Sequence, residues 1–235
     1  MSVFECERVH GVGPGEILSR LISSRYSVRG FKENLVERAT VERLVHQASQ
    51  APSWCNTQPW QVYYIAGDTL EKLRVSLLQA ARDRDSDPDI PFTREYPQPY
   101  FARKKEADSE LMRARNIANT DYRGIVEGIY ANWRFFGAPQ ALVLTVPHAL
   151  LPYALLDLGC FLQNLLLGMV AEGLGACPQA SIAEYPQAIR RHVDIPTGQA
   201  IACGVSFGVP DNAVPANRCR TQRIPVSSVI TYRDE

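Results

Sequence analysis

The most hydrophobic stretch of the chain reads Leu155-Leu-Asp-Leu-Gly-Cys-Phe-Leu-Gln-Asn-Leu-Leu-Leu-Gly-Met-Val-Ala-Glu-Gly-Leu174. Its length would suit a membrane span, but Asp157, Gln163 and Glu172 interrupt the apolar run. We therefore predict a buried central helix over 152–174 that is apolar nearly all round. Because such a helix lacks a solvent face, it needs more cover than one small domain easily supplies, which favours a subunit interface.

Shorter periodic segments on both sides of this helix indicate an α+β fold. The predicted strands are 60–65, 140–146 and 200–207, and the last two resemble buried central strands. The predicted helices are 15–24, a segment from an N-cap at Thr40 to about Ala51, and 69–83, 101–119 and 122–135. The proline-rich segment 87–100 fits no regular element. Because no internal repeat or Gly/Ser linker occurs, we predict one domain over 1–235.

Composition narrows the classes of function. The 235 residues are 46% hydrophobic and 21% charged, which is ordinary for a globular protein. Lys plus Arg and Asp plus Glu each number 25, and this zero net charge gives no reason to expect a nucleic-acid or membrane partner. Six scattered cysteines and four histidines lack ligand spacing, so no metal site is predicted. The first residues show no signal-peptide pattern, and we expect a reducing, cytoplasmic location.

The first segment with functional chemistry is Arg25-Tyr-Ser-Val-Arg29. In an extended backbone, Arg25, Ser27 and Arg29 would point to one side. Arginine binds oxyanions through paired donors and serine adds a neutral donor, so the segment suits a phosphate. A solvated basic loop is the alternative. A later basic segment, Arg218-Cys-Arg220-Thr-Gln-Arg223, offers further phosphate ligands or is a surface turn.

Two further segments carry polar groups on loops. Ala51-Pro-Ser-Trp-Cys-Asn-Thr-Gln-Pro-Trp60 places the amides of Asn56 and Gln58 among aromatic residues. Such a loop suits the edge of a heteroaromatic ring, or is only a structured turn. Gly173-Leu-Gly-Ala-Cys-Pro-Gln-Ala-Ser181 follows the central helix, with Gly175 as the expected left-handed residue at its end. Its backbone N–H groups suit a ring nitrogen, or the segment is simply a helix end.

In this order and at these separations, the segments resemble the FMN-dependent nitroreductase family over about residues 15–232. The anchors are Arg25-Tyr-Ser-Val-Arg-Gly-Phe, Ala51 to Trp60, Gly173-Leu-Gly-Ala-Cys-Pro-Gln-Ala and Arg223-Ile-Pro. The third is most similar to the branch that includes nitrobenzoate reductases. The resemblance implies an α+β sandwich with a central, mainly antiparallel sheet flanked by helices. It also implies an intertwined homodimer with FMN at the subunit interface and the helix 152–174 as the dimer core.

The same resemblance assigns cofactor contacts to particular residues. Those implied near the FMN phosphate, ribityl chain or pyrimidine are Arg25, Tyr26, Ser27, Arg29, Arg220 and Arg223. Those implied to reach the flavin from the other subunit are Pro52, Ser53, Trp54, Asn56 and Gln58. Those implied along the isoalloxazine are Pro178, Gln179 and Ala180. Some members have a lysine at the position of Thr221, so Arg218 or Arg220 would take its place here.

The insertion at about 87–136 is the expected substrate lid. Its aromatic side chains would wall a pocket for a flat substrate. The predicted lining residues are Tyr100, Phe135 and Phe136, with Phe92, Tyr96 and Trp133 nearby. Because lids vary between relatives, the resemblance does not specify the substrate.

The implied activity is reduction of nitroaromatic or quinone-type acceptors with NAD(P)H by a ping-pong mechanism. The flavin N5 would carry the chemistry, so no catalytic side chain is predicted. Arg29 is expected near the N1–C2 edge of the flavin. Two alternatives stay open. One is other flavin chemistry of the superfamily (reductive dehalogenation, ring dehydrogenation or flavin destruction), and the other is a flavin-binding protein without turnover.

Overall fold

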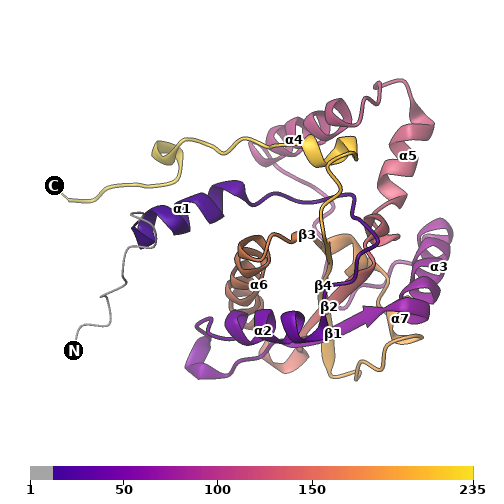
Figure 1. Cartoon of the computed structure of the whole chain (residues 1–235), viewed down its shortest axis with the longest axis horizontal. Helices are drawn as coiled ribbons and strands as arrows, with labels where there is room; N and C mark the ends of the chain where they lie inside the picture. Colours follow the sequence, from indigo (N-terminus) through magenta and orange to yellow (C-terminus); the bar gives the residue numbers. More distant parts are fainter. Residues whose placement is uncertain (1–12, 235) are drawn as a thin grey trace.

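The computed structural model describes residues 13–234, which are built around a four-stranded sheet in the order β1-β2-β4-β3 (Figure 1). The strands are β1 (Gln61–Ala66), β2 (Gln140–Pro147), β3 (Gly175–Gln179) and β4 (Gln199–Gly208). All three strand pairs are antiparallel. The two most apolar strands, β2 and β4, occupy the middle of the sheet, where both faces are covered. The predicted α+β class with a mainly antiparallel sheet is confirmed.

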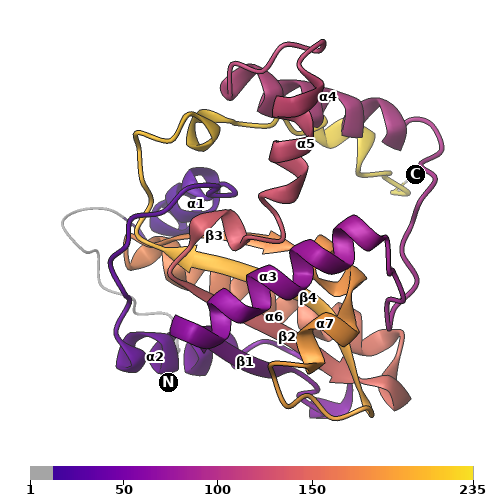
Figure 2. The ribbon, with the colours of Figure 1, turned by 90° about the vertical axis from the view of Figure 1, so that its right-hand side faces the viewer.

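Helices cover both faces of the sheet (Figures 1 and 2). Over one face lie α2 (Arg38–Ala48) and α6 (Tyr153–Ala171), and over the other lie α3 (Gly67–Asp83) and α7 (Pro186–Arg190). Alternate side chains of β2 divide between the two cores, because successive strand residues point to opposite faces. Leu142 and Leu144 join the core under α6, whereas Ala141 and Val143 join the core under α3.

The predicted central helix is α6, which packs against α2 and the sheet. Its buried face includes Phe161, whose ring stacks on Trp60 at 5.1 Å between ring centroids. Length and composition would also allow α6 to cross a membrane, but one face of the helix lies in the core of this fold. The opposite face is apolar and open in the single chain, where Leu156 is 68% exposed.

Two pairs of segments lie outside the sandwich. Figure 1 shows α1 (Pro14–Ser24) and the C-terminal segment extending together from one side of the body. Figure 2 shows α4 (Tyr100–Ala114) and α5 (Tyr122–Tyr130) as a layer beyond one edge of the sheet. None of these three helices contains a fully buried residue. Their positions therefore depend on a few contacts rather than on the two cores.

Several predicted element boundaries are wrong. Thr40 lies inside α2, which begins at Arg38 after an extended Glu37. The two helices of the insertion end at Ala114 and Tyr130, earlier than the sequence predicted. In the second case, the chain turns through left-handed backbone at Phe135, Phe136 and Gly137.

The end of the central helix also differs from the prediction. Gly173, with φ of 71°, takes the left-handed conformation expected at Gly175. Gly175 instead begins β3, a strand that the sequence analysis missed because it contains Pro178 and small residues. A proline is tolerated there because β3 is at the edge of the sheet.

If α6 is the central core element, Leu165→Ala should lower the free energy of unfolding by about 2–5 kcal/mol, because the fully buried side chain leaves a cavity. Val75→Ala, at an exposed position of α3, should change it by less than about 0.5 kcal/mol. Denaturant unfolding of both variants at one protein concentration measures the difference. Equal effects would contradict this packing.

Candidate functional site

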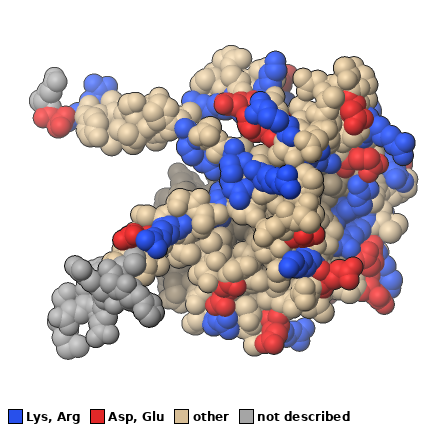
Figure 3. Space-filling view, turned by 45° about the horizontal axis from the view of Figure 1, so that its top comes forward, with Lys and Arg blue, Asp and Glu red and all other residues tan. Residues whose placement is uncertain are grey.

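The N- and C-terminal segments enclose a hollow of about 700 Å³ with four arginines in its wall. The N-terminal segment contributes Arg25 and Arg29, the C-terminal segment contributes Arg220 and Arg223, and Gln163 of α6 adds an amide. Lys and Arg side chains gather on this face of the molecule, near the base of the projecting segments (Figure 3). The structure thus brings together two basic segments that are almost 200 residues apart in sequence.

The positive charge of this hollow is uncompensated. No Asp or Glu lines it, and none of its four arginines forms an ion pair with another described residue. Like charges at this spacing repel one another, and a bound anion would relieve the repulsion. The donor set of guanidiniums, the Ser27 hydroxyl and the Gln163 amide suits a phosphate group.

The N-terminal wall is held by the edge strand of the sheet. Ser27 forms a parallel bridge with Ala176 of β3, and the Val28 N–H donates to the Ala176 carbonyl at 3.0 Å. The Val28 side chain is buried, and the extended backbone turns Ser27 and Arg29 to the opposite side. Burying one valine therefore presents the flanking polar side chains to the hollow.

Asn217 joins the two walls. Its side-chain oxygen accepts from the Arg29 N–H at 2.6 Å, and its amide donates to the carbonyls of Gly30 and Asp211, both at 2.8 Å. Asn217 is only 4% exposed, so these bonds are shielded from water. Gly30 lies so close to Val214 that an added Cβ would overlap that side chain.

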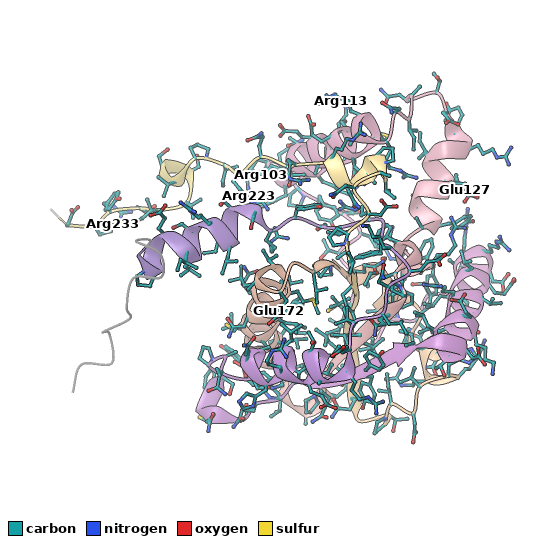
Figure 4. The ribbon with its side chains drawn as sticks, in the orientation of Figure 1. Arg103, Arg113, Glu127, Glu172, Arg223 and Arg233 are labelled. Carbon is teal, nitrogen blue, oxygen red and sulfur yellow. The ribbon has the colours of Figure 1, made fainter. Side chains whose placement is uncertain are left out.

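The two C-terminal arginines have different local support. The Arg220 guanidinium lies 3.5 Å from the Tyr26 ring centroid and donates to the carbonyls of Asn217 and Cys219. Arg223 donates to the carbonyl and hydroxyl of Thr221 and has no cation–π partner among the described residues. Arg223 also lines a neighbouring groove beside Arg103 of α4 (Figure 4). Arg218 and Arg220 were the two residues predicted to assist Arg223. Arg220 lines the hollow with the four arginines (the arginine hollow), and Arg218 does not.

The loop 51–60 lies elsewhere in the same chain, against the beginning of α6. The Trp54 N–H donates to the buried Asp157 carboxylate at 3.1 Å, and the Trp54 ring contacts Tyr153. Cys55, Asn56 and Gln58 all have positive φ. Such backbone costs about 1–3 kcal/mol per residue and clusters at functional sites.

The polar groups of this loop form hydrogen bonds with one another. The Gln58 N–H donates to the Ser53 hydroxyl oxygen, and its side-chain amide donates to Asn56. None of the predicted loop residues, including Pro52, lines the arginine hollow of its own chain.

The predicted ring-facing segment after α6 is only partly available to a ligand. The Gln179 side chain is 3% exposed, donates to the Asn132 carbonyl at 2.8 Å and accepts from the Ser206 hydroxyl. This side chain is therefore committed to the fold, whereas the contact predicted for this segment runs through a backbone N–H and stays a prediction. Pro178 lies in β3 and Ala180 directly follows this strand.

The predicted aromatic residues of the lid separate into three environments. Phe135 has no exposed surface and belongs to the core under α3, so it does not fit a pocket wall. Phe136 is half-buried, with the Arg29 guanidinium 6.0 Å from its ring centroid. Tyr100 is exposed at the start of α4 and contacts Arg103.

Two buried cysteines of the sheet, Cys177 in β3 and Cys203 in β4, are not set up as thiolates. Burial raises the pKa of Cys177, although Arg29 and Ser27 partly oppose the shift. Burial alone raises the pKa of Cys203 to about 12. Both thiols therefore stay protonated near neutral pH.

Comparison with known proteins identifies the architecture that holds this site. The model of the nitroreductase family matches residues 22–209, most of the chain. The chain belongs to the nitroreductase family.

Its relatives in this family include a 4-nitrobenzoate reductase of Pseudomonas putida, which is 31% identical over 86% of this chain and 89% of the relative. A nitrobenzene nitroreductase of Ectopseudomonas oleovorans is 30% identical over 92% and 96%. The solved structure of the FMN-dependent nitroreductase NfnB from Mycobacterium smegmatis in complex with NADPH superimposes with a TM-score of 0.89, at 27% identity over 94% of this chain and all of that chain.

The nitroreductase match includes Arg25 to Arg29 but ends before Asn217, Arg220 and Arg223. The two arginines were predictable from the sequence through their charge. Asn217 was not, because a single asparagine in a polar loop carries no periodic or motif signal. Asp157 was noted only as an interruption of the apolar run, whereas its carboxylate holds the loop 51–60 through the Trp54 N–H.

Asn217→Ala should lower the free energy of unfolding by about 2–4 kcal/mol, because it leaves the Arg29 N–H without a partner and removes two further buried hydrogen bonds, to the carbonyls of Gly30 and Asp211. Asn212→Ala is the matched control, since Asn212 is exposed and makes no side-chain hydrogen bond with described residues. Denaturant unfolding compares the two variants. A loss no larger for Asn217→Ala than for Asn212→Ala would show that Asn217 does not join the walls.

Proposed function

We infer that this nitroreductase-family protein is an FMN-dependent oxidoreductase that uses NAD(P)H to reduce nitroaromatic or quinone-type acceptors. The observation that carries the proposal is the hollow of four uncompensated arginines. FMN ends in a phosphate that is close to doubly charged at neutral pH. Bound there, it would meet bidentate guanidinium donors and replace their mutual repulsion with attraction.

The residues present fit FMN on the evidence of their donor chemistry. Arg25, Ser27, Arg220 and Arg223 would hold the phosphate end, with Tyr26 supporting Arg220 through its ring. Arg29 lines this hollow and also a smaller one beside Phe136, so it lies between the phosphate end and the lid. When bound, FMN supplies two-electron chemistry between NAD(P)H and the acceptor, while the protein supplies binding, orientation and electrostatics.

Arg29 has the surroundings of a residue that stabilises negative charge. Its guanidinium makes one described hydrogen bond, to the Ser27 carbonyl at 3.2 Å, and no described ion pair. Its backbone is fixed by Asn217. A fixed, unpaired cation in a partly water-excluded site favours charge that develops on a neighbouring ring. We propose this electrostatic role for Arg29.

We propose further that two copies of the chain form a dimer and that each site is completed by the other copy's loop 51–60. The support is the apolar surface that a single chain leaves open, including Leu156 and Tyr153 on α6 and Leu18 and Ile22 on α1. Soluble monomers rarely expose such clustered side chains. Sedimentation should give twice the chain mass of 26.2 kDa, and a species of the chain mass would contradict the dimer.

The chain organisation fits the same proposal. One domain would carry a lid formed by the insertion at about 87–136, whose helices α4 and α5 lie outside the sheet sandwich (Figure 2). Such a layer with few buried residues is suited to open and close over a substrate. The proposed location is the cytoplasm, where NAD(P)H is available.

Anaerobic spectroscopy of the purified protein tests this function. A yellow protein should bleach with NADPH or NADH and recover its colour when 4-nitrobenzoate or a quinone is added. A yellow protein that neither nucleotide bleaches would instead indicate flavin binding without this turnover. A colourless protein that does not take up added FMN would overturn the cofactor assignment.

A further inference from the structure

A second, smaller hollow lies between the lid and residues 214–216, with Arg29 of the N-terminal segment also in its wall. Its volume is about 210 Å³, below the roughly 300–1,000 Å³ usual for drug-sized ligands, so it suits a single-ring molecule. Phe136, Leu111 and Val214 give it apolar walls, and Arg115 and Arg29 give it two cationic groups. Arg29 also lines the arginine hollow, so the two hollows are neighbours.

Arg115 enters this hollow from the end of α4. Its side chain is partly buried, yet it makes no hydrogen bond or ion pair with any residue between 13 and 234. The facing residue on α5 is Gly128, where an added Cβ would overlap the Arg115 guanidinium. Gly128 therefore provides the space that admits this side chain. The guanidinium retains its fork of donors for a ligand.

The surroundings of Arg115 and Arg29 favour the binding of one anion between the two guanidiniums. Burial lowers the pKa of Arg115, and the positive charge of Arg29 lowers it further. No carboxylate lines the hollow to offset them. An unpaired, partly buried charge is costly. A carboxylate between the two guanidiniums would remove that cost and accept paired hydrogen bonds.

The charge of the substrate is not decided by family membership. Two of the relatives are 4-nitrobenzoate reductases, whereas others are a nitrobenzene and a chloronitrobenzene nitroreductase. The first kind has an anionic substrate and the other two have neutral substrates. Membership of the family therefore does not decide whether this chain prefers a charged or a neutral nitroaromatic.

We propose that Arg115, together with Arg29, binds the carboxylate of an aromatic acid and makes this protein selective for carboxylated nitroaromatics over neutral ones. The proposal rests on the function proposed above. Phe136 and the apolar wall would contact the ring, while Arg115 supplies the specificity for charge. Arg115 is thus a specificity-determining residue on the lid.

The test compares Arg115→Gln with the matched control Arg113→Gln. Arg113 lies on the same helix, is exposed on the outer side of α4 and pairs with Glu110 (Figure 4). One readout is calorimetric binding of benzoate and of benzamide, neither of which is reduced. The other is KM for 4-nitrobenzoate and for nitrobenzene with the FMN-loaded protein.

Arg115→Gln should weaken benzoate binding and raise KM for 4-nitrobenzoate by roughly 10- to 100-fold, the usual effect of a lost hydrogen bond to a charged group. Benzamide binding and KM for nitrobenzene should change less than about threefold, and Arg113→Gln should resemble the wild type. Gly128→Ala should reproduce the loss of benzoate binding, because it displaces the Arg115 side chain.

Equal effects on charged and neutral ligands would overturn the carboxylate role, as would a raised KM for NADPH with an unchanged KM for 4-nitrobenzoate. The FMN content and NAD(P)H reduction of each variant keep the two proposals separate. If NAD(P)H reduces the flavin of the wild-type protein but the protein does not discriminate between charged and neutral ligands, only the proposed role of Arg115 is refuted. Loss of flavin binding in the wild type would refute the proposed function.

Discussion

The docking of the segment Arg25 to Gly30 between β3 and the C-terminal segment is the constraint on which the site depends. On one side of the segment, Ser27 forms a backbone bridge with Ala176 of β3. On the other side, the Asn217 side chain accepts from the Arg29 N–H and donates to the Gly30 carbonyl. These contacts bring guanidiniums from both ends of the chain around one hollow without a carboxylate. The fold must offset the resulting repulsion with the packing of Val28 and the buried amide of Asn217. An anion in the hollow would stabilise the same arrangement.

Arg29 links the two hollows and therefore the two parts of the proposed reaction. On one side its neighbours are the donors that suit a phosphate, and on the other they are Phe136 and Arg115 of the lid. Because its backbone is fixed by Asn217, its charge is held in place between them. The lid contributes its arginine through α4, an element outside both cores. Selectivity can therefore vary with the lid while the phosphate site stays the same.

Local patterns were sufficient to predict much of this fold. The continuous apolar runs of β2, β4 and α6 identify buried elements, and Arg25-Tyr-Ser-Val-Arg29 combines charge with the spacing of an extended backbone. Features that depend on distant partners were missed or misassigned. The strand β3 is stabilised by its pairing with β4 and has a weak strand sequence. Asn217 and Arg115 acquire their roles only from residues that are far away along the chain.

Three residues of the predicted site show that residue type alone does not decide which side chains are available to a ligand. Phe135 and Phe136 are adjacent aromatics in a predicted lid, but successive left-handed residues send the first into the core and leave the second beside Arg29. Gln179 belongs to the segment predicted to lie along the flavin, yet its side-chain amide is hydrogen-bonded to Asn132 and Ser206. Composition identifies such side chains as candidates, and only the surrounding packing decides which of them remain free.

The central claim is that the arginine hollow holds the phosphate of a flavin nucleotide. FMN and riboflavin differ only in that phosphate, so their dissociation constants from the flavin-free protein test the claim directly. The account predicts that FMN binds at least about 100-fold more tightly at low salt, through several charge-assisted hydrogen bonds, and that added salt narrows the difference. Equal affinities for the two flavins would contradict it.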